Sequence, residues 1–262
     1  MLSDCHVHLA SYDPWEVSEI VHRATDLDVG LIITAGTTLA SSQAGVDLAQ
    51  IYPSVYAGIG IHPLRLRNPL EEDIYESLLR LARSSPKVVA ISETGMDYLP
   101  NAPDRTWQEQ SFRRHIQLAC RLGLPIIWHS QVSEVGITDA HEETLRILRE
   151  EGAGRVGGVM HYFQADEATA WNAIESGFLI SFAKPLLRLP HLLDLAREIP
   201  LQHIVLETDA SPQPWRARRE EWTEPRDIPQ IAQKLAHLKG LSLEEVAEAT
   251  TANLAKLLRI SN

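Results

Sequence analysis

Asp4, His6 and His8 alternate with Cys5 and Val7 within the first eight residues of the chain. On an extended strand alternate side chains point to the same side, so the two imidazoles are expected to share one face. Two imidazoles at this spacing form half of a metal site, and Asp4 beneath them is placed to orient one ring. The motif alone indicates metal binding only weakly, because many histidines simply pack. The prediction therefore depends on further ligands elsewhere in the chain.

Four further side chains that bind divalent metals stand at the ends of later apolar runs. Glu93 ends AISE, His129 ends IIWH, His161 ends GVMH, and Asp209 follows VLET. Taken singly, a histidine at a strand end is commonly a hydrogen-bonded core residue, and an acid there commonly caps the next helix. Six candidate ligands at the ends of different runs are harder to explain in that way. They favour one shared metal site.

Six ligands exceed what one zinc ion needs, because a catalytic zinc usually keeps three protein ligands and a water. The surplus predicts two divalent ions bridged by a carboxylate. Such ions share a water that is deprotonated at neutral pH and attacks as a metal-bound hydroxide. The mixture of imidazole and carboxylate suits zinc, manganese or magnesium, and the number of imidazoles favours zinc or manganese.

Short β-branched runs alternate with longer amphipathic stretches from end to end, which is typical of repeated βα units around a parallel sheet. Strands are expected at 2–8, 30–35, 55–61, 87–93, 124–129, 156–161, 178–182 and 203–208. Helices are expected at 15–27, 70–84, 106–122, 141–152, 166–176, 189–199, 226–239 and 242–258. Eight parallel strands close into an α/β (β/α)8 TIM barrel, whose active site lies at the carboxyl ends of its strands. No linker divides residues 1–262, so a single domain is expected.

Composition narrows the possible partners and the compartment. The chain has 24 lysine and arginine residues and 35 aspartate and glutamate residues, which gives a formal net charge of −11. This negative charge disfavours a protein that binds nucleic acid through the electrostatic potential of its whole surface. A phosphate-bearing substrate then needs metal ions and local arginines. No apolar run is long enough for a membrane span, and no secretory leader is evident. Cys5 and Cys120 are expected to be reduced thiols. A cytoplasmic protein without an obligate protein partner or membrane contact is the resulting prediction.

Six segments in chain order carry a recognisable set of motifs: DCHVH at 4–8, GIGIHP at 58–63, AISETGMDY at 90–98, LACRLGLPIIWHS at 118–130 preceded by Gln110 and Phe112, HYF at 161–163, and ETDAS at 207–211. Together they resemble the TatD-related metal-dependent hydrolases, within the amidohydrolase-type barrels, over nearly the whole chain. The resemblance implies a ligand set divided between two ions: His6, His8 and Asp209 on one, His129 and His161 on the other, and Glu93 bridging them. It also implies that Asp209 accepts the proton of the attacking water.

The chain departs from the pattern of this family beside the expected site. Family members read HSR where this chain has Gln131 in place of arginine, followed by an apparent insertion of several residues within QVSEVGITDAHEETL. Ser92 stands in place of a glycine, Gln164-Ala165-Asp166 in place of a small residue and glycine, and Thr223-Glu224-Pro225 in place of Asn-Glu-Pro. Because the ligands are intact and these neighbours are not, the resemblance supports a hydrolase more firmly than a nuclease.

Three residues near the expected site have both a functional and a purely structural interpretation. His62 either acts on the substrate or leaving group, or only caps the turn before Pro63. Glu207 lies two residues before Asp209, and a buried acid there is expected to bond a ligand histidine. Lys184 is the preferred phosphate ligand, whereas most of the arginines after the eighth strand, Arg216, Arg218, Arg219 and Arg226, are expected to be solvated. Among the tryptophans, Trp215 and Trp222 are the candidates for stacking on bases at the mouth.

The function predicted from these residues is a two-metal hydrolase that cleaves phosphodiester bonds, and the resemblance implies family members that are deoxyribonucleases acting often from the 3′ end. Two alternatives stay open. The first is a hydrolase of a small ester, amide or lactone on the same scaffold, which the acidic surface and Gln131 favour. The second is a non-catalytic barrel that binds metal or a partner.

Overall fold

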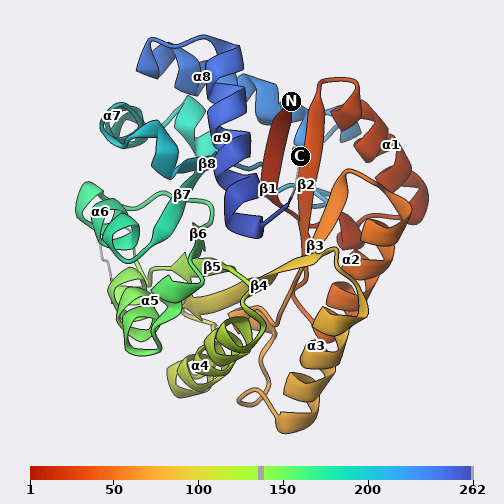
Figure 1. Cartoon of the computed structure of the whole chain (residues 1–262), viewed down its shortest axis with the longest axis vertical. Helices are drawn as coiled ribbons and strands as arrows, with labels where there is room; N and C mark the ends of the chain where they lie inside the picture. Colours follow the sequence, from red (N-terminus) through yellow and green to blue (C-terminus); the bar gives the residue numbers. More distant parts are fainter. Residues whose placement is uncertain (135–138, 261–262) are drawn as a thin grey trace.

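The computed structural model describes residues 1–134 and 139–260. Its eight parallel strands are hydrogen-bonded in chain order within one sheet (Figure 1). The strands are β1 (Leu2–Val7), β2 (Val29–Ala35), β3 (Val55–Ile59), β4 (Val88–Asp97), β5 (Ile126–Gln131), β6 (Gly158–Met160), β7 (Phe178–Phe182) and β8 (Ile204–Leu206). A parallel bridge between Val7 and Ala210 joins β1 to the segment after β8. The predicted (β/α)8 barrel is confirmed.

The helices lie outside this sheet and cover it. They are α1 (Pro14–Thr25), α2 (Leu39–Ile51), α3 (Glu72–Ser84), α4 (Arg105–Leu122), α5 (Asp139–Glu150), α6 (Glu167–Glu175), α7 (Pro190–Glu198), α8 (Ile228–Lys239) and α9 (Leu243–Leu258). The sequence prediction did not include α2, whose segment is rich in alanine, serine and glycine and shows little apolar periodicity. A capping box between Thr38 and Ser41 begins α2, just as Ser242 and Glu245 begin α9.

Two layers of apolar side chains form the core. Most buried apolar residues pack between the strands and the surrounding helices. A smaller cluster joins residues of the strand faces turned to the barrel interior, such as Leu31, Ile127 and Val205, to Leu254 and Leu258 of α9. Helix α9 therefore closes one end of the barrel, as it lies across the strands in Figure 1. The other end is left for the functional site.

Several predicted strand boundaries are wrong in ways that matter for the site. Strand β4 runs to Asp97, so Glu93 lies inside the strand and does not end it. Strand β5 likewise extends two residues beyond His129. The simple alternation predicted for β1 also fails, because its register against β2 shifts between Asp4 and Val7. As a result Cys5 belongs to the interior cluster and Val7 to the helix-facing layer.

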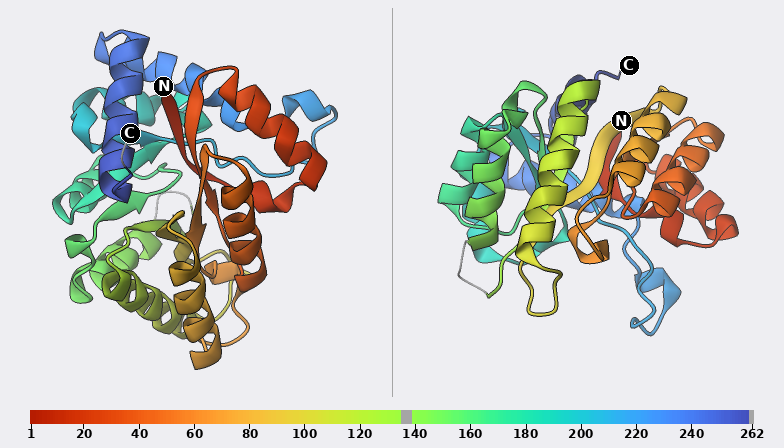
Figure 2. Two further views of the ribbon diagram at one scale, coloured as in Figure 1. Left: turned by 45° about the vertical axis from the view of Figure 1, so that its right-hand side comes forward. Right: turned by 90° about the horizontal axis from the view of Figure 1, so that it is seen from below.

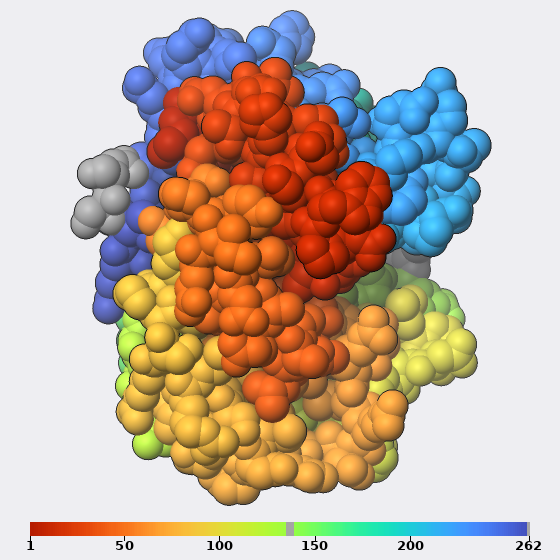
Figure 3. Space-filling view, turned by 90° about the vertical axis from the view of Figure 1, so that its right-hand side faces the viewer, coloured from red at the N-terminus to blue at the C-terminus, as the bar shows by residue number. Residues whose placement is uncertain are grey.

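The loops that follow the strands reach different distances from the barrel. The segment 211–224, after β8, projects from the body of the molecule as a separate lobe beside α1 (Figures 2 and 3). Trp215 within it is 74% exposed. Residues 135–138, which fall within the segment of the apparent insertion after Gln131, lie outside the described part of the chain. No helix of residues 1–134 and 139–260 combines the length and the apolar character that crossing a bilayer requires.

Candidate metal centre

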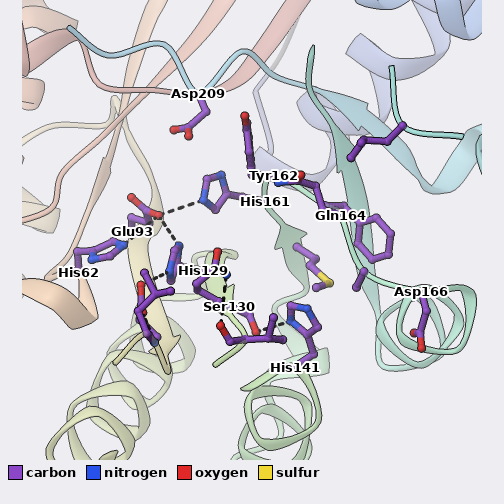
Figure 4. A pocket seen from close by; sticks show the side chains of 18 of the residues that line it. His62, Glu93, His129, Ser130, His141, His161, Tyr162, Gln164, Asp166 and Asp209 are labelled. Carbon is purple, nitrogen blue, oxygen red and sulfur yellow. Dashed lines mark hydrogen bonds and ion pairs between the residues drawn. The ribbon is translucent and has the colours of Figure 1, made fainter. Parts of the chain in front are cut away.

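Glu93 lies between two separate sets of imidazoles. Its Oε2 is 3.5 Å from Nε2 of His6 and 3.5 Å from Nε2 of His8. Its Oε1 is 3.0 Å from Nδ1 of His129 and 3.0 Å from Nε2 of His161. The side chain is 5% exposed, and Figure 4 shows His62, His129 and His161 around it. One carboxylate thus presents a different oxygen to each pair of histidines.

The far nitrogens of two of these rings have hydrogen-bond acceptors, and that of the third faces a carboxylate without forming a hydrogen bond. Nδ1 of His8 lies 3.3 Å from the carbonyl oxygen of Ala35, at the end of β2. Nδ1 of His161 lies 3.3 Å from Oε1 of Glu207. His129 is held at Nε2 by Asp97, as described below. Acceptors of this kind set the tautomer and orientation of metal-binding histidines.

Asp209 approaches the first pair of histidines from the segment after β8. Its Oδ1 lies 3.3 Å from Nε2 of His8 and 3.8 Å from Nε2 of His6. The backbone of Asp209 has a φ of 51°, a left-handed conformation that side chains other than glycine seldom adopt. Its N–H donates to the carbonyl oxygen of His6 at 3.0 Å, within the junction that closes the barrel. Barrel closure therefore holds this carboxylate beside the imidazoles.

The donor set fits metal ions. His6 is fully buried, and neither of its ring nitrogens has a hydrogen-bond partner among the described residues. A buried imidazole with nothing bound is costly, so an ion on Nε2 would explain the arrangement. His6, His8 and Glu93 bring ligand atoms within 4.8 Å of one another, and Glu93, His129 and His161 do the same. These two groups share Glu93, as neighbouring ions bridged by a carboxylate require.

The charges of the site also favour cation binding. Burial alone would raise the pKa of Glu93, but the surrounding imidazoles, His62 and His161 foremost, hold that pKa well below its ordinary value. Burial likewise opposes ionisation of Asp209, and the hydrogen bond with His8 outweighs it, so the pKa of Asp209 is lowered. Both carboxylates are therefore ionised at neutral pH. Burial lowers the pKa of His6, which keeps this imidazole neutral and able to bind a metal.

The chain matches a family model and several known proteins over nearly its whole length. The model described as TatD related DNase matches residues 3–259. The chain belongs to this family. The metal-dependent hydrolase YabD of Bacillus subtilis is 33% identical over 268 residues, covering 100% of both chains. The 3′-5′ ssDNA/RNA exonuclease TatD of Citrobacter rodentium is 32% identical and covers 93% of this chain and 92% of its own. The crystal structure of YjjV, a TatD homologue from Escherichia coli, superposes with a TM-score of 0.87 at 26% identity, covering 99% of this chain and 98% of that one.

Within this TatD-family barrel, His62 contacts both the turn that follows it and the bridging carboxylate. Its Nδ1 accepts the N–H of Leu64 at 3.1 Å, so the ring caps the turn Pro63–Arg65. Its Nε2 lies 3.4 Å from Oε1 of Glu93. The structural role thus fixes the ring where the functional role needs it. Glu207 lies 3.3 Å from Nδ1 of His161 without a hydrogen bond between them, and it accepts the N–H of Tyr162 and the thiol of Cys5.

Asp4 does not orient an imidazole. Its carboxylate accepts the N–H of Thr208 at 3.0 Å and that of His6 at 3.3 Å, and the hydroxyl of Thr208 also donates to it. The register shift in β1 turns this side chain towards the segment after β8. Asp4 therefore ties β1 to the chain just before Asp209, and its effect on the metal centre is through the backbone.

Lys184 is not brought to the site. Its Nζ pairs with Asp227 at 2.7 Å and donates to Thr223 at 3.2 Å, and it does not line the cavity above the metal centre. Trp222 packs 6.3 Å, between ring centroids, from Tyr12, which leaves Trp215 as the exposed tryptophan of the pair. Arg218 pairs with Glu221 at the exposed surface, as expected, whereas Arg219 and Arg226 both pair with the buried Glu224 and so differ from the expectation of a solvated surface.

The sequence prediction missed Asp97. It is 1% exposed, and its Oδ2 lies 3.0 Å from Nε2 of His129. Gln108 of α4 clamps the backbone of Asp97, accepting its N–H at 2.7 Å and donating to its carbonyl oxygen at 2.8 Å. Glu93, Gly95 and Asp97 follow one another at alternate positions. Extending the fourth run beyond Glu93 would have placed Asp97 on the same face.

A cavity of about 1390 Å³ opens above the metal centre. Its wall includes four of the candidate metal ligands: Glu93, His129, His161 and Asp209. Gln131 also lines it, and so does His141, a histidine that the sequence prediction did not include. Nδ1 of His141 lies 2.7 Å from the hydroxyl of Ser130. Burial lowers the pKa of His141 to about 4, so this pair is neutral at physiological pH. The cavity is larger than most sites for small ligands, which are roughly 300–1,000 Å³.

Proposed function

We propose that this chain is a two-metal phosphodiesterase that acts on single-stranded nucleic acid. The observation that carries the proposal is the placing of Glu93, one oxygen of which faces His6 and His8 while the other faces His129 and His161. This arrangement suits two neighbouring ions and exceeds what one ion needs. The exonuclease named among the relatives supports nucleic acid as the substrate.

The proposed roles of the residues follow from their positions. His6, His8 and Asp209 would hold one ion, His129 and His161 the other, and Glu93 would bridge them. Two ions bound there would stabilise the charge that develops on the phosphoryl oxygens and make a water acidic enough to attack at neutral pH. Asp209, 29% exposed and facing the cavity, is placed to accept the proton of that water. His62 is placed to orient the scissile group or to protonate the leaving oxygen.

Zinc or manganese is the proposed metal. Four of the six ligands are imidazoles, and imidazole binds these ions more readily than it binds magnesium, which prefers oxygen ligands and water. A cytoplasmic site of action is proposed from the cysteines. Cys5 and Cys120 are free, as suits a reducing compartment.

One observation favours a second candidate, a hydrolase of small esters or amides. Gln131, which lines the cavity, is uncharged, and acidic residues outnumber lysine and arginine along the described wall. A polyanion gains little from such a surface. Under this alternative the metal centre is unchanged and the reaction is the attack of water on a carbonyl carbon.

One set of assays separates the two candidates. The metal-free protein is loaded with zinc, manganese or magnesium and incubated with single-stranded DNA, single-stranded RNA, bis(4-nitrophenyl) phosphate and 4-nitrophenyl acetate. Hydrolysis of the strands that ends on adding a chelator supports the proposal. Hydrolysis of the neutral ester alone would establish the second candidate, and metal content by mass spectrometry identifies the bound ion. A loaded protein that hydrolyses none of them would contradict both.

A further inference from the structure

Tyr162 directly follows the candidate ligand His161, and its ring lines the cavity above the metal centre. The centroids of these two rings are 6.0 Å apart. In Figure 4 the Tyr162 ring stands between Asp209 and Gln164. Tyr162 is not among the six candidate metal ligands. Its side chain therefore lies at the border of the metal centre, where a substrate would be bound.

The backbone of Tyr162 is held in a conformation that bulky residues seldom adopt. Its φ is 49°, within the left-handed region. The buried carboxylate of Glu207 accepts its N–H. The next residue, Phe163, is buried and donates its N–H to the carbonyl oxygen of Ser181 in β7 at 3.1 Å. The surrounding structure thus enforces the conformation, and residues held in this way are concentrated at functional sites.

The phenol hydroxyl of Tyr162 is free to bind a ligand. It has no hydrogen-bond partner among residues 1–134 and 139–260, although the residue is half-buried. By contrast, the hydroxyl of Tyr12 donates to the carbonyl oxygen of Thr223 at 3.4 Å. A phenol keeps its proton at neutral pH and is then a hydrogen-bond donor. A half-buried donor without a protein partner, at the wall of a cavity, is suited to an acceptor on a bound substrate.

Charges of both signs lie near this hydroxyl. Burial raises the pKa of Tyr162, the carboxylates of Asp209 and Glu207 add to the rise, and the guanidinium of Arg188 opposes it. Arg188 is exposed and has no ion-pair partner in the part of the chain that the structure describes. A phosphate beside Asp209 would be repelled by that carboxylate. A neutral donor and a nearby cation on the same side offset this repulsion.

We propose that Tyr162 is a catalytic residue, whose hydroxyl donates a hydrogen bond to a non-bridging oxygen of the scissile phosphate. The inference rests on the proposed phosphodiesterase function and deepens it. Asp209 is placed to accept the proton of the attacking water, so a phosphate attacked there lies beside the neighbouring phenol. The phenol keeps its own proton throughout the reaction. Because its backbone is held by Glu207, the donor is in place before the substrate binds.

The test uses Tyr162→Phe, which removes the hydroxyl and keeps the ring. With the zinc- or manganese-loaded protein and bis(4-nitrophenyl) phosphate, kcat is expected to fall about 10–100-fold, as for the loss of one donor to a reacting oxygen. Metal content and the thermal midpoint are expected to stay at the values of the wild type. Tyr98→Phe is the matched control, because Tyr98 is a buried tyrosine just after β4 that does not line the cavity. It is expected to leave kcat unchanged.

A second arm measures the contact with phosphate independently of turnover. Inorganic phosphate is titrated into the metal-loaded wild type, Tyr162→Phe and Tyr98→Phe, and its affinity is measured by calorimetry. The affinity is expected to fall about tenfold in Tyr162→Phe, because a hydrogen bond to a charged acceptor is lost. It is expected to be unchanged in Tyr98→Phe. A ring that only packs against His161 would leave the affinity unaltered, since phenylalanine packs in the same way.

An unchanged kcat or an unchanged affinity for phosphate in Tyr162→Phe would overturn the inference, while the proposed phosphodiesterase chemistry would stand. A fall in kcat that is accompanied by loss of metal or by a lower thermal midpoint would also overturn it, because Tyr162 would then act by supporting the site. A wild-type protein that hydrolyses no diester contradicts the proposed function itself, before any variant is compared. The two failures are therefore distinguishable.

Discussion

Oδ2 of Asp97 lies 3.0 Å from Nε2 of His129, while Nδ1 of the same ring lies 3.0 Å from Oε1 of Glu93. A carboxylate at Nε2 holds the proton there and leaves the lone pair of Nδ1 directed at the space beside Glu93. Gln108 clamps the backbone of Asp97 on both its N–H and its carbonyl oxygen. The orientation of a ligand histidine on β5 is thus set by helix α4 acting through β4.

Replacing Asp97 by asparagine is expected to weaken metal binding at the His129 side. An amide can accept the ring proton but carries no charge, so affinity should fall about 10–100-fold. The fold should persist because asparagine still accepts the N–H of Leu99, which Asp97 bonds at 3.0 Å. Calorimetric titration of the metal-free protein with zinc measures the change, with Asp104→Asn at the start of α4 as the control. Unchanged affinity at both sites would show that Asp97 only supports the loop.

Substitution at Glu93 and at Asp209 should have different effects. Glu93→Gln removes the charge that both groups of histidines share, so bound metal and hydrolysis should be lost together. Asp209→Asn should retain most of the metal, because His6, His8 and Glu93 remain, while kcat falls about 10²–10⁴-fold from loss of the base. Metal content, kcat and circular dichroism are measured on the same preparations. Activity near that of the wild type in both variants would contradict the two-metal mechanism.

The fold and the ligands could be predicted because they depend on local pattern. A strand buried on both faces reads as a short apolar run, and the residue that ends the run lies at the carboxyl edge of the sheet. His129 and His161 were located in this way, although β5 continues beyond His129. Helix α2 was not predicted because its residues are mostly small and show no apolar stripe. The only local signal of its start is the cap at Thr38.

What could not be predicted depends on contacts between distant segments. Lys184 is engaged by Asp227, a partner 43 residues along the chain that no local pattern relates to it. The hydrogen bonds between Asp4 of β1 and Thr208 form only when the barrel is closed and the register of β1 has shifted. Ion pairs near the mouth likewise join distant segments, as Arg219 pairs with Glu16 of α1. Pairing of that kind is decided by the tertiary structure.

The two roles of His62 can be separated by His62→Asn. Asparagine caps a turn well, so the N–H of Leu64 keeps an acceptor and the thermal midpoint should change little. The imidazole that faces Glu93 at 3.4 Å is lost, however, and kcat on a diester substrate should fall about 10²-fold. His62→Ala, which loses both roles, is the comparison and should also lower the midpoint. If the asparagine variant keeps full activity, His62 serves only as a cap.

Stability below neutral pH is expected to depend on His115. This fully buried ring of α4 accepts the N–H of Ile61 at Nε2 and lies 2.7 Å from the carbonyl oxygen of Ser111 at Nδ1. Burial lowers its pKa from 6.5 to about 4. Because the unfolded chain binds the proton more readily, the stabilisation is complete above about pH 6.5 and is lost progressively as the pH falls towards about 4.

The linkage amounts to about 2 kcal/mol of unfolding free energy between about pH 7.5 and pH 5. Urea unfolding of the metal-free protein at these two pH values measures it. His115→Gln cannot take up a proton in this range, so it should lose about 2 kcal/mol less than the wild type on acidification, although it is less stable at both pH values. Other histidines titrate equally in both proteins and cancel in the comparison. An identical loss in the two proteins would mean that His115 does not bind its proton on unfolding.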